Sequence, residues 1–224
     1  MSISFIHDKR QYPLVWYASY GSNMDTERFT CYIRGGTPSG ASRNYAGCDD
    51  KSMPIAETSI ELPYSLYFAG ESSVWTGGAA LINNTVSKHR TKSKAYLITK
   101  AQFEQVVAQE SRRNHVVPMD IVQLRRHGRL INGDGNGQYD QILYCGEYKR
   151  YPVVTCTSSW LKLPYTRPSH AYLKTIISGL QSGHNLSKDD ILQYLRNKPG
   201  ISGNYSSAEL SDVILQSLSQ SIAT

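Results

Sequence analysis

The chain has 224 residues, and its 24 Lys and Arg against 18 Asp and Glu give a formal charge of +6. The composition is 40% hydrophobic and 19% charged, which excludes a mostly disordered chain, and the absence of periodic glycine excludes collagen. No apolar stretch approaches the roughly 20 residues of a membrane-spanning helix, so we expect a soluble globular protein with one large or two small domains.

The N-terminal third begins with a buried strand and continues into a segment with little periodicity. Leu14–Tyr20 is rich in aromatic and apolar residues, which predicts a strand that stops at the tight loop Gly21–Asn23. From Arg34 to about Ile60 the chain is rich in Gly, Ser, Asn and Asp, and we predict irregular structure. Further strands are predicted at Leu66–Phe68, Val74–Ile82 and Lys94–Ile98.

A helix is predicted to follow Thr99. Thr99 and Gln102 have the spacing of a capping box, and apolar residues recur at helical spacing at Phe103, Val106 and Val107. Glu110 falls on the same apolar stripe, which points its carboxylate inward. Most such acids lie at the rim of a core, paired with an arginine or a backbone donor. An inward carboxylate is nevertheless a better site candidate than an outer one, because burial raises its pKa toward the range of a general base.

The last part of the chain changes from strands to helices. Ile142–Tyr148 and Val153–Ser158 are predicted to form a hairpin after a polar stretch at Asn132–Gly137. Helices are predicted at Ser169–Leu180, Ser187–Arg196 and Ser206–Ser217. The last two are predicted to open with capping boxes, Ser187 with Asp190 and Ser206 with Glu209. Strands followed by helices favour an α+β fold over alternating βαβ units. We expect one domain at residues 1–186 and a C-terminal helical extension at 187–224, which packs on the domain or mediates self-association.

Location and redox state follow from the N-terminus and the cysteines. The opening MSISFIHDKRQ places charged residues directly after Phe5 and Ile6, so it forms no signal-peptide hydrophobic region and a cytoplasmic location is expected by default. The four cysteines are far apart and lack a C-x-x-C pair, which predicts buried free thiols instead of a zinc site or redox motif. They are Cys31, Cys48, Cys145 and Cys156.

Several common enzyme motifs are absent. The sequence has no G-x-S-x-G elbow, no P-loop and no G-x-G-x-x-G after a strand, so it does not support a serine hydrolase or a nucleotide-binding enzyme. Asp134–Gln138 begins like a calcium loop, but Tyr139 replaces the required glycine and Cys145 replaces the bidentate glutamate, so a polar turn is expected. We therefore predict no metal and no cofactor.

Two glycine-containing segments stand out, and the first of them is a candidate ligand loop. At Tyr20–Asn23, glycine lets the backbone approach a ligand closely, and the following amides and polar side chains offer several donors to one anion. A purely structural turn is the commoner role of such a sequence. Trp75–Gly78 places paired glycines in a predicted strand, which indicates close packing against the backbone, a bulge or a barrel corner.

These motifs resemble those of a known superfamily. Tyr17–Met24 is similar to the YGSN signature that opens the γ-glutamylcyclotransferase-like proteins, and Trp75–Gly78 is similar to a later segment of them. The short helix ending in Glu110 matches the place of their single catalytic glutamate, and Pro168–Tyr172 resembles the helix whose tyrosine lies near the pocket. The resemblance spans Leu14 to Leu180. Ser19 replaces an expected alanine, and the segment after Leu186 has no counterpart, which leaves the substrate open.

The resemblance implies a fold, a reaction and a set of site residues. The expected fold is a small mixed, strongly bent or barrel-like β-sheet with flanking helices. The expected reaction is attack of a γ-glutamyl α-amine on its own γ-amide, which releases 5-oxoproline and an amine or amino acid. Glu110 would be the general base and then the general acid, with backbone amides around Gly21–Asn23 holding a carboxylate or oxyanion. The implied substrate-binding residues are Tyr17, Ala18, Ser19, Tyr20, Gly21, Ser22, Asn23 and Tyr172.

Two other classes of function remain open. Basic clusters at Lys88–Lys94 and Arg125–Arg129, together with abundant tyrosine, could bind nucleic acid, although a modest charge excess is more often a solvated surface. The fold could also bind a small ligand without catalysis. We expect a small-molecule γ-glutamyl substrate and no membrane partner, and the sequence does not define the oligomeric state.

Overall fold

The computed structural model describes residues 13–38, 43–72, 74–133, 137–160 and 163–220. The predictions for residues 1–12 at the N-terminus and for residues 134–136 of the polar turn lie outside these ranges. In chain order the elements are β1 (Leu14–Ser19), the 3₁₀ turn η1 (Ser22–Met24), α1 (Thr26–Arg34), β2 (Ala56–Leu62), β3 (Leu66–Ala69), β4 (Ala79–Ile82), β5 (Thr91–Thr99), α2 (Lys100–Glu110), α3 (Ile121–His127), β6 (Arg129–Ile131), β7 (Gln141–Tyr148), β8 (Tyr151–Thr157), α4 (His170–His184), α5 (Lys188–Leu195) and α6 (Ser207–Gln220).

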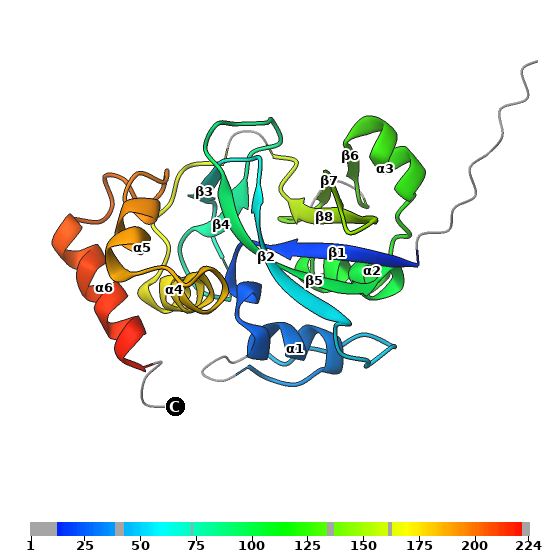
Figure 1. Cartoon of the computed structure of the whole chain (residues 1–224), viewed down its shortest axis with the longest axis horizontal. Helices are drawn as coiled ribbons and strands as arrows, with labels where there is room; N and C mark the ends of the chain where they lie inside the picture. Colours follow the sequence, from blue (N-terminus) through cyan, green and yellow to red (C-terminus); the bar gives the residue numbers. More distant parts are fainter. Residues whose placement is uncertain (1–12, 39–42, 73, 134–136, 161–162, 221–224) are drawn as a thin grey trace, which may run out of the picture.

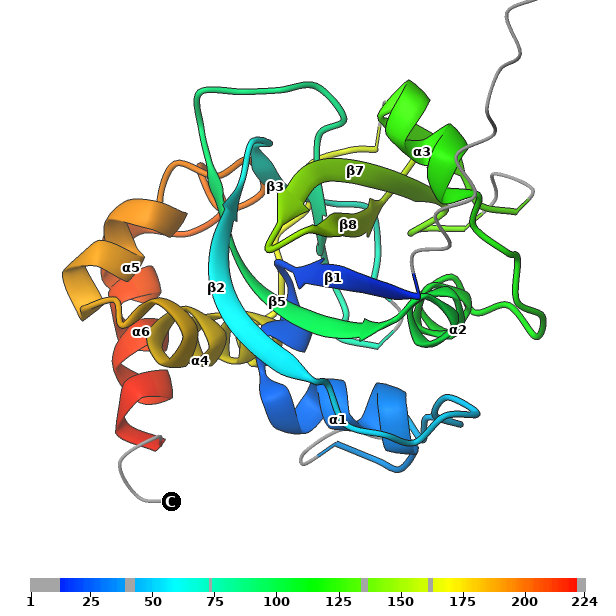
Figure 2. The same ribbon diagram turned by 45° about the vertical axis from the view of Figure 1, so that its right-hand side comes forward.

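Within the described ranges, the strands form a six-stranded mixed sheet in the order β2-β5-β1-β8-β7-β6 and a separate β3-β4 pair. β1 lies in the middle, antiparallel to β5 and parallel to β8. The long strands β2 and β5 are strongly curved (Figure 2). The predicted α+β class with a bent mixed sheet is therefore confirmed, and so is the β7-β8 hairpin.

Successive side chains of β1 point to opposite faces of the sheet and contribute to a separate core cluster on each face. Trp16 and Ala18 belong to a cluster shared with α4, α5 and α6, whereas Val15 and Tyr17 belong to a cluster shared with α1, α2 and α3. In Figure 1, α4, α5 and α6 gather at one end of the molecule and α3 lies at the other. Because successive strand residues face opposite sides, one short apolar strand holds both layers together.

The predicted helix caps are found where the spacing indicated them. Thr99 accepts from the backbone of Gln102 and the Gln102 side chain accepts in return, which is the predicted capping box of α2. Ser187 and Asp190 form the same arrangement at α5. These reciprocal bonds satisfy backbone donors that the first helical turn leaves unpaired.

Other elements differ from the sequence predictions. The segment predicted as irregular contains β2, whose AETSIEL sequence is mostly exposed at the sheet edge and so lacks an apolar signal. Helix α1, helix α3 and strand β6 were not predicted. The strand predicted at Val74–Ile82 is confined to β4, because Trp75–Gly78 turns instead, with positive φ at Thr76 and Gly77.

The paired glycines of that turn allow the close packing that their sequence indicated. A Cβ on Gly77 would lie 2.3 Å from the Arg167 carbonyl oxygen, and one on Gly78 would lie 2.1 Å from that of Thr166. Both contacts are far inside van der Waals distance, so only glycine lets this turn pack against the segment that leads into α4.

The C-terminal helices share the core of the sheet. Ile191 and Leu195 of α5 and Leu210 of α6 are fully or almost fully buried in the same cluster as β1. Arg167 joins the segment before α4 to α6 through an ion pair with Glu209. The division of the chain at residue 186 stays a prediction.

Three findings within the described residues concern membrane-spanning helices, cysteines and metal-ligating groups. Among the described helices, none has the length and apolarity needed to cross a bilayer. All four cysteines are free, as predicted, with Cys48 and Cys156 buried and Cys31 and Cys145 half-buried. The described residues contain no group of three or more His, Cys, Asp or Glu side chains that could hold a metal ion.

Candidate active site

The loop after β1 and the end of α2 meet in one pocket. The empty space in and above it is about 640 Å³, part of which is open solvent. Every predicted site residue except Ala18 lines it. Ala18 is fully buried beneath it, and its carbonyl accepts from Thr155 at 2.7 Å. The lining residues are Tyr17, Ser19, Tyr20, Gly21, Ser22, Asn23, Arg28, Tyr32, Arg43, Ser72, Val74, Trp75, Ala79, Ala80, Glu110, Arg112, Gln138, Tyr139, Cys156 and Tyr172.

The loop at residues 21–23 is held from three sides. A Cβ on Gly21 would lie 3.1 Å from the Tyr172 hydroxyl, so a larger residue would press on that phenol. The 3₁₀ turn then closes with a bond from Met24 N–H to the Gly21 carbonyl at 3.1 Å. Asp25 next caps α1 by accepting from the Arg28 N–H at 2.9 Å. Between the end of β1 at Ser19 and the start of α1 at Thr26, the chain uses six residues, and Ser22 and Asn23 among them line the pocket.

Asn23 connects the loop to Glu110. Its Nδ2 donates to Glu110 Oε1 at 2.7 Å and lies 3.5 Å from the Tyr17 hydroxyl. Burial is the largest influence on Glu110 and raises the pKa of its carboxyl above the ordinary 4.5, although Arg28, hydrogen bonding with Tyr32, Arg43 and Asn23 all oppose the shift. A carboxylate with a raised pKa beside fixed donors is suited to accept and return a proton near neutral pH.

Arg28 is a site residue that the sequence prediction missed. Its guanidinium is buried, with Nε donating to Ser22 Oγ at 2.9 Å and Nη2 donating to the Tyr45 hydroxyl at 2.7 Å. The group also lies 4.6 Å from the centre of the Trp75 ring. The signal that the sequence prediction missed was helix α1, which carries Arg28. Asp25 is a good N-cap, and apolar residues follow at helical spacing at Phe29, Tyr32 and Ile33.

Two polar atoms in the pocket have no hydrogen-bond partner among the described residues. They are Arg28 Nη1 and Asn23 Oδ1, both buried. Buried polar groups are nearly always paired, and an unpaired one costs roughly 1–3 kcal/mol. These two atoms, on residues that line one pocket, are therefore able to pair with an anionic group and with a hydrogen-bond donor.

Aromatic rings also line the pocket. Tyr172, on α4, stacks on Trp75 with ring centres 5.5 Å apart and accepts from the Ala80 N–H at 3.2 Å. Burial raises the pKa of the Tyr172 phenol to about 12, so it stays protonated at neutral pH. Tyr139, which the sequence prediction missed, donates to the Ala80 carbonyl at 3.0 Å. This part of the pocket therefore combines flat apolar surface with fixed hydroxyl groups.

The fold and the site together define a class: an α+β protein with a buried single-carboxylate pocket lined by arginine and tyrosine. No protein-family model matches the chain. The chain is 34% identical to histone deacetylase 5 of Arabidopsis thaliana over 198 aligned positions, covering 81% of this chain and 30% of that protein. It thus spans less than a third of the length of the curated relative it matches.

Among solved structures, the chain is similar to a gamma-glutamyl cyclotransferase with 18% identity and a TM-score of 0.48, covering 91% of this chain and 99% of that one. It is also similar to an uncharacterized human protein with 15% identity and a TM-score of 0.49, at the same coverage. At TM-scores below 0.5, neither an activity nor a substrate follows from these likenesses.

Proposed function

We propose that this chain is a γ-glutamylcyclotransferase-like enzyme that converts a γ-glutamyl amide into 5-oxoproline and a free amine. The observation that carries the proposal is the 2.7 Å hydrogen bond between Asn23 and Glu110. It joins the motif loop to the acid at the end of α2, which are 87 positions apart, inside a single pocket. Two features selected separately in the sequence thus lie together around one buried carboxylate.

The first step requires a deprotonated amine near the amide carbonyl. The substrate α-amine loses a proton to Glu110 and attacks the γ-carbonyl carbon, so a C–N bond forms and closes a five-membered ring. The nucleophile is part of the substrate, and the pocket only has to fold it. In well-oriented intramolecular reactions this arrangement is worth on the order of 7–11 kcal/mol of the barrier.

The second step breaks the original amide. The tetrahedral intermediate collapses, the C–N bond to the leaving amine breaks, and Glu110 returns its proton to that nitrogen. Backbone amides of Gly21–Asn23 would stabilise the oxyanion. The net reaction consumes no water and leaves Glu110 in its initial ionised state, so one carboxyl group suffices as base and acid.

Arg28 would hold the α-carboxylate of the glutamyl group. Its Nη1 is the unpaired donor in the pocket, while its other two donor positions are fixed by Ser22 and Tyr45. Tyr172 and Trp75 would pack along the aliphatic part of the glutamyl chain. The substrate would thus be oriented by an ion pair at one end and by ring contacts along its length.

The direct test is release of 5-oxoproline from γ-glutamyl amino acids, γ-glutamyl amines and glutathione by wild type and Glu110→Gln. The amide keeps an oxygen for Asn23 but cannot accept the proton, so we expect a loss of about 10²- to 10⁴-fold in kcat. Activity of Glu110→Gln close to wild type would refute the base assignment. No product from any wild-type incubation, with a ligand still bound in the pocket, would favour a binding protein.

A further inference from the structure

Two arginines line the mouth of the pocket beyond the carboxylate. Arg43 and Arg112 belong both to the pocket and to a neighbouring, more open hollow of about 1,050 Å³. Val74 is the third residue that lines both. A substrate whose glutamyl half occupies the inner pocket would extend across these shared residues, so its leaving group would lie in the outer hollow.

The positions of both arginines are fixed relative to Glu110. Arg43 Nη2 donates to the carbonyl of Gln109 at 2.9 Å, and the guanidinium lies 4.7 Å from the centre of the Tyr45 ring. Arg112 follows α2 by two residues and has a φ of 54°, a conformation that costs energy for a residue with a Cβ. This turn brings the side chain of Arg112 to the mouth of the pocket.

The charge of the outer hollow is unbalanced. Its described lining residues include three arginines and no carboxylate. Arg113 is engaged elsewhere, since its Nη1 donates to the Asn132 carbonyl at 2.8 Å. The Arg112 guanidinium is exposed and has no hydrogen bond or ion pair within the described part of the chain. Arg43 and Arg112 therefore offer positive charge where the inner pocket meets the outer hollow, whereas Arg28 lines the inner pocket alone.

We infer that the leaving group of the substrate is anionic, and that Arg43 and Arg112 select it. The inference rests on the proposed function, because it assigns the inner pocket to the glutamyl half. The preferred substrate is a γ-glutamyl amide of an amine that carries carboxylate or phosphate groups. An uncharged alkylamine would leave both arginines solvated and gain nothing from them.

The inference is tested by binding to Glu110→Gln, in which turnover is suppressed. Three ligands share the glutamyl half and differ in the leaving group: γ-glutamyl-glutamate, γ-glutamyl-phosphoethanolamine and γ-glutamyl-ethylamide. We expect one or both anionic ligands to bind about tenfold tighter than the ethylamide at low salt, with the gap narrowing as ionic strength rises. The tighter anion identifies the carboxylate or the phosphate as the natural group.

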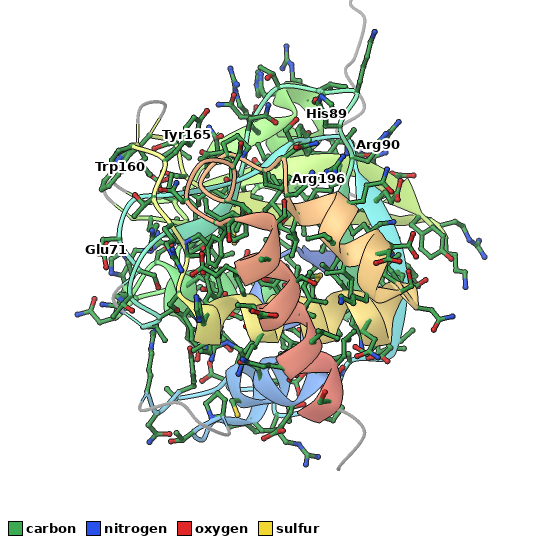
Figure 3. All side chains as sticks on the ribbon, turned by 90° about the vertical axis from the view of Figure 1, so that its left-hand side faces the viewer. Glu71, His89, Arg90, Trp160, Tyr165 and Arg196 are labelled. Carbon is green, nitrogen blue, oxygen red and sulfur yellow. The ribbon has the colours of Figure 1, made fainter. Side chains whose placement is uncertain are left out.

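Substitutions assign the preference to the two side chains. Arg43→Gln and Arg112→Gln, each combined with Glu110→Gln, should weaken binding of the anionic ligands about three- to tenfold and leave the ethylamide unchanged. Arg90→Gln is the matched control, because Arg90, labelled beside His89 in Figure 3, is exposed and lines neither hollow. It should change none of the three affinities.

The outcomes separate this inference from the proposed function. Equal binding of the three ligands, with 5-oxoproline released by wild type, refutes the leaving-group preference and leaves the reaction intact. Binding that favours the anions without any 5-oxoproline from wild type supports the charge preference and refutes the reaction. Failure of all three ligands to bind refutes both.

Discussion

Replacing Arg28 by lysine separates the structural role of this buried cation from its proposed role in binding. Lysine keeps the positive charge but cannot donate from three fixed positions. The guanidinium bonds to Ser22 at 2.9 Å and to Tyr45 at 2.7 Å. Hydrogen bonds from a charged group are worth about 1.5–3 kcal/mol each, and the contact with Trp75 adds about 0.5–2 kcal/mol. Loss of one bond and part of the ring contact should cost about 2–4 kcal/mol of stability.

A loss of this size should leave the variant folded at room temperature and should be measurable as a lower Tm. For a chain of this length, each kcal/mol lowers Tm by about 2–4 °C, so Arg28→Lys should melt about 4–16 °C below wild type. Arg34→Lys is the matched control, because Arg34 lies exposed in the last turn of the same helix. The control should stay within about 0.5 kcal/mol of wild type.

Kinetics would then reveal the proposed binding role. If Nη1 of Arg28 pairs with the substrate carboxylate, its loss should raise KM about tenfold to 150-fold, since 1.36 kcal/mol is a factor of ten. The contact would exist in ground state and transition state alike, so kcat should change little. The assay is 5-oxoproline release well below Tm. A lower Tm with an unchanged KM would refute the carboxylate assignment and leave Arg28 a structural residue.

Three further substitutions and one matched control test the site and its support. Asn23→Ala removes a hydrogen bond that lowers the pKa of the proposed base, so the acid limb of the kcat/KM profile should move to higher pH; a shift to lower pH would contradict this. Tyr172→Phe leaves a buried N–H of β4 unpaired, costing about 1–3 kcal/mol, and thermal melting should show a Tm about 2–12 °C lower. Gly179→Ala places a Cβ 2.4 Å from that of Met24 and should destabilise the protein by about 1–3 kcal/mol. Gly183→Ala on the same helix places a Cβ 3.5 Å from its nearest neighbour and should stabilise the protein by about 0.5–1 kcal/mol. Denaturant melts in which both changes have the same sign would refute this account of the packing.

The pH dependence of stability has a definite sign for Glu110. Burial raises the pKa of its carboxyl in the folded state above the ordinary 4.5. The folded protein then holds a proton that the unfolded chain has lost, so the stability contribution falls as pH rises from about 4.5 through the folded pKa. Glu110→Gln should therefore be at least as stable as wild type at neutral pH, with the difference shrinking on acidification. Chemical denaturation at several pH values measures this difference.

The sequence by itself determined the local features of this protein. Strand β1 follows from an unbroken apolar run, and the caps of α2 and α5 follow from pairs three residues apart, because these signals depend on neighbours in the chain. The inward position of Glu110 follows from helical spacing alone. The α+β class follows from the order of strands and helices. The strand, the caps and the position of Glu110 depend only on residues close together in the chain, and the class depends only on the order of the elements.

The tertiary structure alone decided what surrounds the carboxylate. Arg28 lies 82 positions from Glu110, and no local pattern shows that both line one pocket. The same is true of Arg43 and Arg112, whose charges meet at the mouth only because the segment before Tyr45 packs beside the end of α2. The edge strand β2 was also missed, since its pairing with β5 supplies the stability that its polar sequence lacks. The grouping of charged side chains and the pairing of edge strands depend on contacts between residues far apart in the sequence, and these contacts form only in the folded protein.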